Sequence, residues 1–431
     1  MAKNANNKVS IWQSLHNAWK VQDIRKKLIY TFLMLILFRL VGVIPAPGVD
    51  YVRVKSAISG SNLPLLDLVN MMTGSNFSNM TIMAMGITPY INSSIIMQLL
   101  TIAIPALERL SKSGPEGQKK IASITRYVTI VLAVIQAIGL VYSLGYIKSG
   151  WFNTVLVGVS MAAGTALAMW IGERITKNGL GNGVSLLIFA GIISNLFNGF
   201  TSLIANAFSA TSLTPWLTLL AVLLFALVMI VVVTFVDMGV RRIQVQYAKR
   251  VTGRKMYGGQ SSILPLKVCS VGVMPLIFAY SFMAFPSTLI QLLGGSESGL
   301  GLWWSRYMNY YSPLYMIVTS LLIIAFTYFY TSISFQPDEM AKNIQQQGGV
   351  IPHVRPGKPT ADFLARTNNR LTLFAALFLA VLATLPNLFT VGLQTSVPFA
   401  ASSLLIAVSV VLETKRQLDD LLVSRNYDTL T

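Results

Sequence analysis

The sequence predicts an all-α polytopic membrane protein, and three observations lead to that prediction. Of its 431 residues, 54% are apolar and only 11% are charged, and the mean hydropathy is +0.62. The apolar residues gather into ten long runs, and the positive charge gathers on one side of them. Soluble domains carry about 25% charged residues, so the composition excludes an ordinary globular protein.

Each of the ten runs is long enough to cross a bilayer as a helix, because a helix satisfies its own backbone polar groups in lipid. Apart from Arg39, no run contains an Asp, Glu, Lys or Arg. We expect transmembrane helices at 28–44, 80–104, 127–147, 151–171, 183–204, 215–236, 268–293, 313–335, 371–391 and 394–412.

The distribution of lysine and arginine predicts the orientation of these helices. If the N-terminus is cytoplasmic, 28 of the 33 Lys and Arg residues lie in cytoplasmic segments and 4 in outer loops. Cytoplasmic loops are enriched in Lys and Arg, so we expect both termini inside. The cytoplasmic segments are then the N-terminus 1–27, the loops 105–126, 172–182, 237–267 and 336–370, and the tail 413–431.

Charge and cysteine content limit the partners further. The cytoplasmic loops account for the pI of about 10.0 without requiring a nucleic acid. The single cysteine, Cys269, falls in the seventh run and excludes an intramolecular disulfide or a cysteine-based metal site. The first run follows a long polar N-terminus and precedes a rigid Pro45-Ala46-Pro47 turn, so we expect it to be retained rather than cleaved as a signal peptide.

The ten runs divide into two sets of five, 28–204 and 215–412, around the outer loop 205–214. Because each set has an odd number of spans, the two sets enter the membrane from opposite sides. Halves that share a fold would then be inverted repeats, a plan typical of transport proteins. No residue-level repeat accompanies the span count.

The outer segment 45–79 contains a short amphipathic stretch at 62–72, bracketed by Gly60 and Gly74. It is too short to cross a bilayer. It could lie on the outer surface as an interfacial helix, or fold back between the spans as a re-entrant segment.

Two cytoplasmic loops have more order than orientation requires. In loop 237–267, Ile243, Val245 and Tyr247 alternate with polar residues, which predicts a hairpin strand. Loop 336–370 has a helix start at Pro337, a break at Gly348-Gly349 and then a stiff turn rich in proline and glycine. These features favour a docking surface over a solvated tether.

No catalytic constellation is found in the sequence. The two histidines, His16 and His353, lie far apart in polar cytoplasmic stretches, and no acid lies within a run. An enzyme would therefore lack a nucleophile, a base and a metal site. Ion-coupled transporters usually bury Asp, Glu or His at mid-membrane, so a small-solute secondary transporter is the weaker alternative to a passive channel, and an intramembrane enzyme ranks third.

Polar and helix-breaking residues within the runs point to a lined cavity. We expect Pro89 and Pro275 to break their helices mid-span, where neighbours or water can satisfy the backbone. Arg39 could snorkel outward, bond backbone carbonyls inside the bundle, or act in transport. The segment 179–183 predicts a tight cytoplasmic turn, which read alone is a helix cap.

Several separate motifs, in the right order and over nearly the whole chain, resemble the SecY family, the pore subunits of the bacterial protein-conducting channel. The motifs are Phe38-Arg39 with Ile44–Gly48, Gly86–Ile91, Trp170–Thr176 leading into Gly179–Ser185, Arg241-Arg242-Ile243 with Tyr247–Arg250, Pro265–Val268, Ile351–Lys358 and Ser403–Ile406.

The resemblance implies ten helices in two inverted halves around a central pore, closed by a ring of apolar side chains. It also implies that 62–74 is a re-entrant plug, which replaces the surface helix as our expectation. The ring would comprise Ile87, Ile91, Ile188, Ile192, Ile277 and Ile406, and the plug side chains would be Leu63, Leu65, Leu66, Asp67, Leu68 and Asn70.

A lateral gate for hydrophobic segments would lie near Thr88, Gln136 and Cys269. The family usually has Asn where this chain has Cys269, which should weaken the polar cluster of the gate. His353 stands where the family often has Gly, and the loop 113–118 departs from the usual acidic-basic pattern.

The resemblance further implies the partners. They would be SecE and SecG, the SecA ATPase or a translating ribosome, preproteins bearing signal sequences, and membrane lipid. No cofactor or metal is expected, and the location would be a bacterial inner membrane. The motor or ribosome would dock on a cationic surface, since acidic protein and ribosomal RNA both attract such charge. Its residues would be Arg241, Arg242, Lys249, Arg250 and Arg355.

Overall fold

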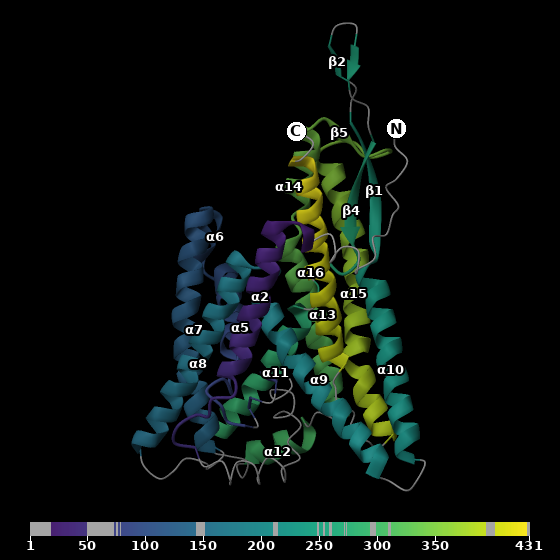
Figure 1. The fold of residues 1–431 in the computed structure, drawn as a ribbon. Coiled ribbons are helices and arrows are strands. Elements are labelled where there is room, and N and C mark those ends of the chain that lie inside the picture. The colour runs from purple at the N-terminus through teal and green to yellow at the C-terminus, as the bar shows by residue number, and fades with distance from the viewer. Residues whose placement is uncertain are drawn as a thin grey trace. The chain divides into compact units, whose positions relative to one another are not determined.

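A computed structural model describes most of the chain, with one long helix at each of the ten predicted runs (Figure 1). The described residues are 19–49, 73–74, 76–77, 79–143, 151–209, 214–247, 250–252, 255–257, 261–270, 272, 274–293, 299–308, 312–393 and 401–428. The long helices are α2(Gln22–Val41), α5(Thr88–Ala103), α7(Pro115–Ser143), α8(Trp151–Asn178), α9(Gly183–Ser209), α10(Thr214–Asp237), α11(Met274–Leu293), α13(Pro313–Ser334), α15(Lys358–Leu393) and α16(Ala401–Asp428).

Three shorter helices and five strands complete the described structure. Six of the described helices are each long and apolar enough to cross a membrane, and α5 with the short helix after it makes a seventh if this bent pair is one span. The shorter elements are α6(Pro105–Lys112), α12(Gly299–Tyr307), α14(Pro337–Gln346), β1(Val240–Tyr247), β2(Arg250–Thr252), β3(Lys255–Tyr257), β4(Ser261–Lys267) and β5(Gly349–Val350).

The prediction that Pro89 and Pro275 break helices mid-span is wrong. Each lies in the first turn of its helix, α5 or α11. Backbone N–H groups in the first turn have no intrahelical acceptor, so proline costs no hydrogen bond there. The apolar run from residue 80 is not helical before Thr88, because Thr81 forms an isolated bridge with Pro45 and residues 82–87 form turns. A sharp bend of 102° comes instead between α5 and α6, next to Pro105.

The chain forms two compact units: Met1–Leu219 with Ser281–Tyr310 and Pro398–Thr431, and Leu220–Tyr280 with Tyr311–Val397. In the first unit α7 packs against α5 and α8, α2 packs against α8 and α9, and α16 packs against α9. In the second unit α15 packs against α13 and α14.

In the first unit the chain after α2 forms a bonded hairpin with the turns before α5. The Ala46 N–H donates to the Met80 carbonyl at 3.1 Å, and the Ile82 N–H donates to the Ile44 carbonyl at 3.0 Å. The buried side chains of Phe77, Met80 and their neighbours form one apolar cluster beneath this hairpin. Non-helical backbone at membrane depth requires such internal satisfaction.

In the second unit the loops 237–267 and 336–370, which are predicted to be cytoplasmic, form one body. β1 pairs antiparallel with β4, and β5 pairs with the other edge of β1. The alternation in β1 buries Ile243 and Val245 against Ile344, Ile351 and other apolar residues of the second loop. The predicted hairpin strand and the predicted helix after Pro337 are both confirmed.

The turn 179–183 is a tight cap, as predicted, and it also locks α8 to α9. The Asn182 Oδ1 accepts from the Val184 N–H at 3.1 Å, and the Gly183 N–H donates to the Thr176 Oγ1 at 2.9 Å. A Cβ on Gly183 would overlap the carbonyl of Gly172 on α8. Only glycine allows the two helices to approach so closely.

We therefore expect Gly183→Ala to lower the free energy of unfolding by about 1–3 kcal/mol, the usual cost of overpacking. Gly299→Ala is the matched control, because a Cβ there meets nothing within 4 Å. Thermal unfolding of the purified protein in detergent checks the prediction. Equal midpoints for the two variants would contradict the close approach of α8 and α9.

Candidate functional site: a buried isoleucine set and a cationic hairpin

All six isoleucines of the predicted ring are buried. The Ile91 N–H donates to the Ile87 carbonyl at 3.1 Å, so these two residues stand one turn apart at the start of α5. Ile188 and Ile192 are likewise one turn apart on α9. Burial of isoleucine provides apolar surface with no group that can bind water or ions, as a hydrophobic constriction requires.

The remaining two ring residues lie on other helices. Ile406 is on α16, which packs against α9 within the first unit. Ile277 is in the first turn of α11, within the second unit. The complete ring combines both units and stays a prediction.

Arg39 bonds backbone carbonyls inside the first unit, which confirms one of the three interpretations of this residue. Its guanidinium donates to the carbonyl of Gly74 at 3.3 Å and also to the carbonyl of Ala190. Gly74 is the last residue of the predicted plug. The six predicted plug side chains, from Leu63 to Asn70, lie outside the described residues.

The predicted lateral-gate residues take three different positions. Thr88 is the first residue of α5, and Gln136 is buried on α7. The expectation that Cys269 lies within a span is wrong, because α11 begins only at Met274. Cys269 is in the turn that follows β4, where its Sγ is 3.7 Å from the Gly272 carbonyl oxygen. The predicted span began before the true start of α11 because the preceding turn is itself largely apolar.

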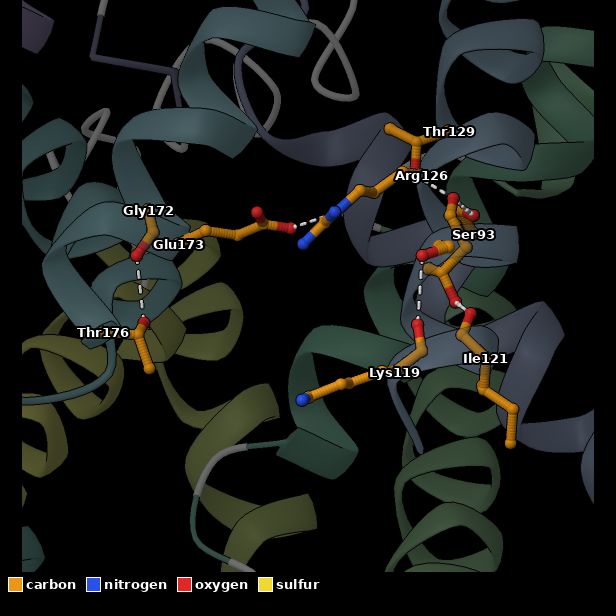
Figure 2. A network of polar contacts seen from close by, with 10 residues as sticks. Ser93, Lys119, Ile121, Arg126, Thr129, Gly172, Glu173 and Thr176 are labelled. Carbon is orange, nitrogen blue, oxygen red and sulfur yellow. Dashed lines mark hydrogen bonds and ion pairs between the residues drawn. The ribbon is translucent and has the colours of Figure 1, made fainter. Parts of the chain in front are cut away.

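The α5–α7 interface contains a polar network that sequence reasoning missed (Figure 2). The Ser93 hydroxyl on α5 donates to the Thr125 carbonyl on α7 at 2.8 Å, and the Thr129 hydroxyl donates to the same carbonyl at 2.7 Å. Ser93 and Thr129 are fully buried. Only the Ser93 bond crosses between the two helices, since Thr129 and Thr125 both lie on α7. An interhelical bond of this kind contributes about 0.6–2 kcal/mol in membranes, so it helps to fix the register of α5 against α7.

An ion pair joins α7 to α8 beside this network (Figure 2). The Arg126 Nε lies 2.7 Å from a carboxylate oxygen of Glu173. Both side chains are partly exposed, so the pair contributes about 0–1 kcal/mol. The 47-residue separation left no sequence signal for this pair.

The predicted docking cations that the structure describes lie in the loops 237–267 and 336–370 of the second unit. Arg241 and Arg242 are exposed on β1, opposite Leu266 and Pro265 of β4. Arg355 is exposed in the turn after β5. Arg250 begins β2, and Lys249 lies outside the described residues.

The turn that carries Arg355 is held by its own hydrogen bonds. The buried Thr360 hydroxyl donates to the Arg355 carbonyl at 2.8 Å, and the Val354 N–H donates to the Ile351 carbonyl at 3.1 Å. His353 has φ +66°, the left-handed region that favours glycine. This conformation gives a physical reason for the glycine that the SecY family often has there.

Burial, and then the nearby carboxylate of Asp237, raise the pKa of the Cys269 thiol to about 11. Both causes disfavour the thiolate. The thiolate is the reactive form of cysteine, so Cys269 is chemically protected at neutral pH.

Together these features define a multi-pass α-helical membrane protein whose buried polar groups serve helix packing. Among the described residues no group of three or more His, Cys, Asp or Glu could hold a metal ion.

A family model described as SecY matches residues 81–415. The chain is 40% identical to the protein translocase subunit SecY of Streptomyces galbus over 430 residues, covering 95% of this chain and 98% of the relative. The chain belongs to the SecY family.

Two solved structures share the fold. A SecY structure, whose plug domain is described as stabilising the closed state of the translocation channel and maintaining a membrane seal, aligns with TM-score 0.66 and 21% identity over 92% of both chains. Sec61 in a canine ribosome-channel complex from the endoplasmic reticulum aligns with TM-score 0.64 and 18% identity over 92% of both chains. The ten-helix SecY fold is thus the fold of this chain.

The single cysteine makes the raised pKa testable. Maleimide labelling of Cys269 at pH 8 should be roughly 100-fold slower than that of an ordinary thiol, because the thiolate fraction falls tenfold for each unit of pKa. The rate should keep rising about tenfold per pH unit from pH 8 to 10, where an ordinary cysteine has levelled off.

The control replaces Cys269 by Ser and moves the cysteine to the exposed neighbour with Ser270→Cys. Mass spectrometry measures the labelled fraction over time. Equal rates at positions 269 and 270 would contradict the burial of the Cys269 thiol.

Proposed function

We propose that this chain is the central subunit of a SecYEG-type protein-conducting channel in a bacterial inner membrane. It passes unfolded secretory proteins across the membrane and releases hydrophobic segments sideways into lipid. Membership of the SecY family over nearly the full length is the observation that carries this proposal. Both termini and the cationic hairpin would face the cytoplasm, as the excess of Lys and Arg supports.

The isoleucine ring would close the pore when no substrate is present, and it would surround the polypeptide during transport. Its side chains offer neither hydrogen bonds nor charge, so water and ions gain nothing by entering. The same absence of specific groups allows any sequence to pass. The plug at 62–74 would add a second seal on the outer side.

The lateral gate would open near Thr88, Gln136 and Cys269. The register of α5 against α7, set by the Ser93–Thr125 bond, supports a rigid gate edge in the first unit. Where the family usually has an asparagine, Cys269 offers only a weak thiol donor, so the polar cluster of the closed gate would be weaker.

The cytoplasmic body would dock the SecA ATPase or a translating ribosome. Two observations support this: the exposed cations Arg241 and Arg242 on β1 and Arg355 in the turn after β5, and the structural relative that occurs in a ribosome complex. SecE and SecG would complete the complex in the membrane. A small-solute transporter has no comparable support, because no acidic residue lies in the ten apolar runs to couple an ion.

Reversal of one docking cation tests the proposed function. Arg355→Glu should abolish SecA-dependent preprotein transport in proteoliposomes, because it places a negative charge where the acidic partner surface would bind. Lys120→Glu is the control, since it makes the same charge change on the exposed start of α7. Co-purification with SecE and SecG verifies that each complex is intact. Transport at the wild-type rate by Arg355→Glu would refute the docking role.

A polar substitution in the ring tests the seal. Ile406→Asn should raise the resting ion leak across planar bilayers by at least about tenfold, since full burial of an isoleucine is worth about 1.5–3 kcal/mol and 1.4 kcal/mol is a factor of ten. Leu224→Asn on α10 is the control, because that side chain is 61% exposed and would face lipid. An unchanged leak in Ile406→Asn would count against the ring.

A further inference from the structure

Arg39 is the one charged side chain within an apolar run, and the structure gives it two backbone acceptors. It lies in the last turn of α2 and donates to the carbonyls of Gly74 and Ala190. Among the described residues no carboxylate pairs with it. A cation in a spanning helix costs about 2.5–3.5 kcal/mol on insertion scales. A retained, half-buried guanidinium with carbonyl partners is therefore a candidate for a role beyond folding.

The first acceptor lies within the proposed ring. Ala190 is on α9 between Ile188 and Ile192, which are both buried. A guanidinium bonded to this carbonyl fixes the position of α9 at the height of its two ring residues. Because the bond is to backbone, it holds the helix itself rather than a side chain that can change rotamer.

The second acceptor lies at the end of the proposed plug. Gly74 has φ +71°, and a Cβ on it would lie 2.6 and 2.9 Å from the guanidinium nitrogens and 3.0 Å from the Gly191 Cα. Only glycine can occupy this position between Arg39 and α9. The chain is thus in close contact with α9 at residue 74, and Arg39 bonds both segments at once.

The chain that follows Gly74 is fixed independently of Arg39. Asn76 and Phe77 are buried, and the Thr81 N–H donates to the Asn76 carbonyl at 3.1 Å. Loss of the Arg39 contacts would therefore leave the hairpin after residue 76 in place. It would release only the junction between residue 74 and α9.

We propose that Arg39 is a positioning residue for the resting seal: its guanidinium ties the end of segment 62–74 to α9 beside Ile188 and Ile192. This inference rests on the proposed function, because it takes the ring and the plug from there. The planar guanidinium has five N–H donors in a fixed fork and can hold two carbonyls at once, whereas a lysine ammonium is a single point of attachment. Arg39→Met removes both bonds without leaving a buried charge.

The experiment measures resting ion leak of the purified complex in planar bilayers, together with driven preprotein transport. Arg39→Met should raise the resting leak at least about tenfold while transport continues, because the contact holds only the closed state. Arg39→Lys should leak less than Arg39→Met, since one bond can be restored. Gly74→Ala should leak like Arg39→Met, because its Cβ displaces the guanidinium.

A double variant separates one shared contact from two independent defects. If Arg39 and Gly74 act through the same contact, Arg39→Met with Gly74→Ala should leak no more than either single variant. A purely structural role would instead lower protein yield, melting temperature and transport together in all variants, and that result would overturn the inference. Gly74→Ala keeps the test available if Arg39→Met fails to accumulate.

Ile192→Asn distinguishes failure of this inference from failure of the proposed function. If Ile192→Asn leaks and Arg39→Met is as tight as the wild type, the ring stands and the positioning role of Arg39 is refuted. If neither variant leaks, the ring assignment fails, and the inference fails with it.

Discussion

The need to satisfy every backbone polar group in lipid governs the rest of this structure. Most of the chain meets it with helices, but the segment before α5 does not: residues 82–87 are turns. That segment is tolerated because its amides bond one another and the chain after α2, as in the bond from Ala46 to Met80. Arg39 extends the same solution by donating to carbonyls at Gly74 and Ala190. Side-chain and backbone donors thus satisfy carbonyls in a part of the first unit where the backbone is not helical.

Close packing in the first unit follows from a second consequence of the lipid environment. Lipid tails are as apolar as leucine, so helices associate through small residues and interhelical hydrogen bonds. Gly183 allows α9 to approach Gly172 of α8, and Ser93 bonds the Thr125 carbonyl across the α5–α7 interface. These contacts hold the helices of the first unit against one another, so the predicted ring residues on α5 and α9 keep fixed positions within that unit.

Hydropathy and periodicity in the sequence predicted helices and strands correctly, but hydropathy misplaced helix starts where an apolar segment is not helical. All ten runs contain a helix, and the alternation of Ile243 and Val245 predicted the hairpin of the second unit. Pro89 was misplaced because hydropathy continues through the buried turns before α5, and hydropathy does not measure helix. The Arg126–Glu173 pair could not be predicted, since no local pattern links residues on two different helices. Nor could composition select six isoleucines from the many in the spans; only the family motifs did.

In the second unit the strand pair β1–β4 lies close in sequence to the helices α10 and α11. β1 begins three residues after α10 ends at Asp237, and the paired strand β4 leads through the Cys269 turn toward α11. The turn of Arg355 contacts the same apolar cluster through Ile351. A force applied to this surface would therefore reach the strand pair first and then the start of α11, where Ile277 lies one turn inside the helix.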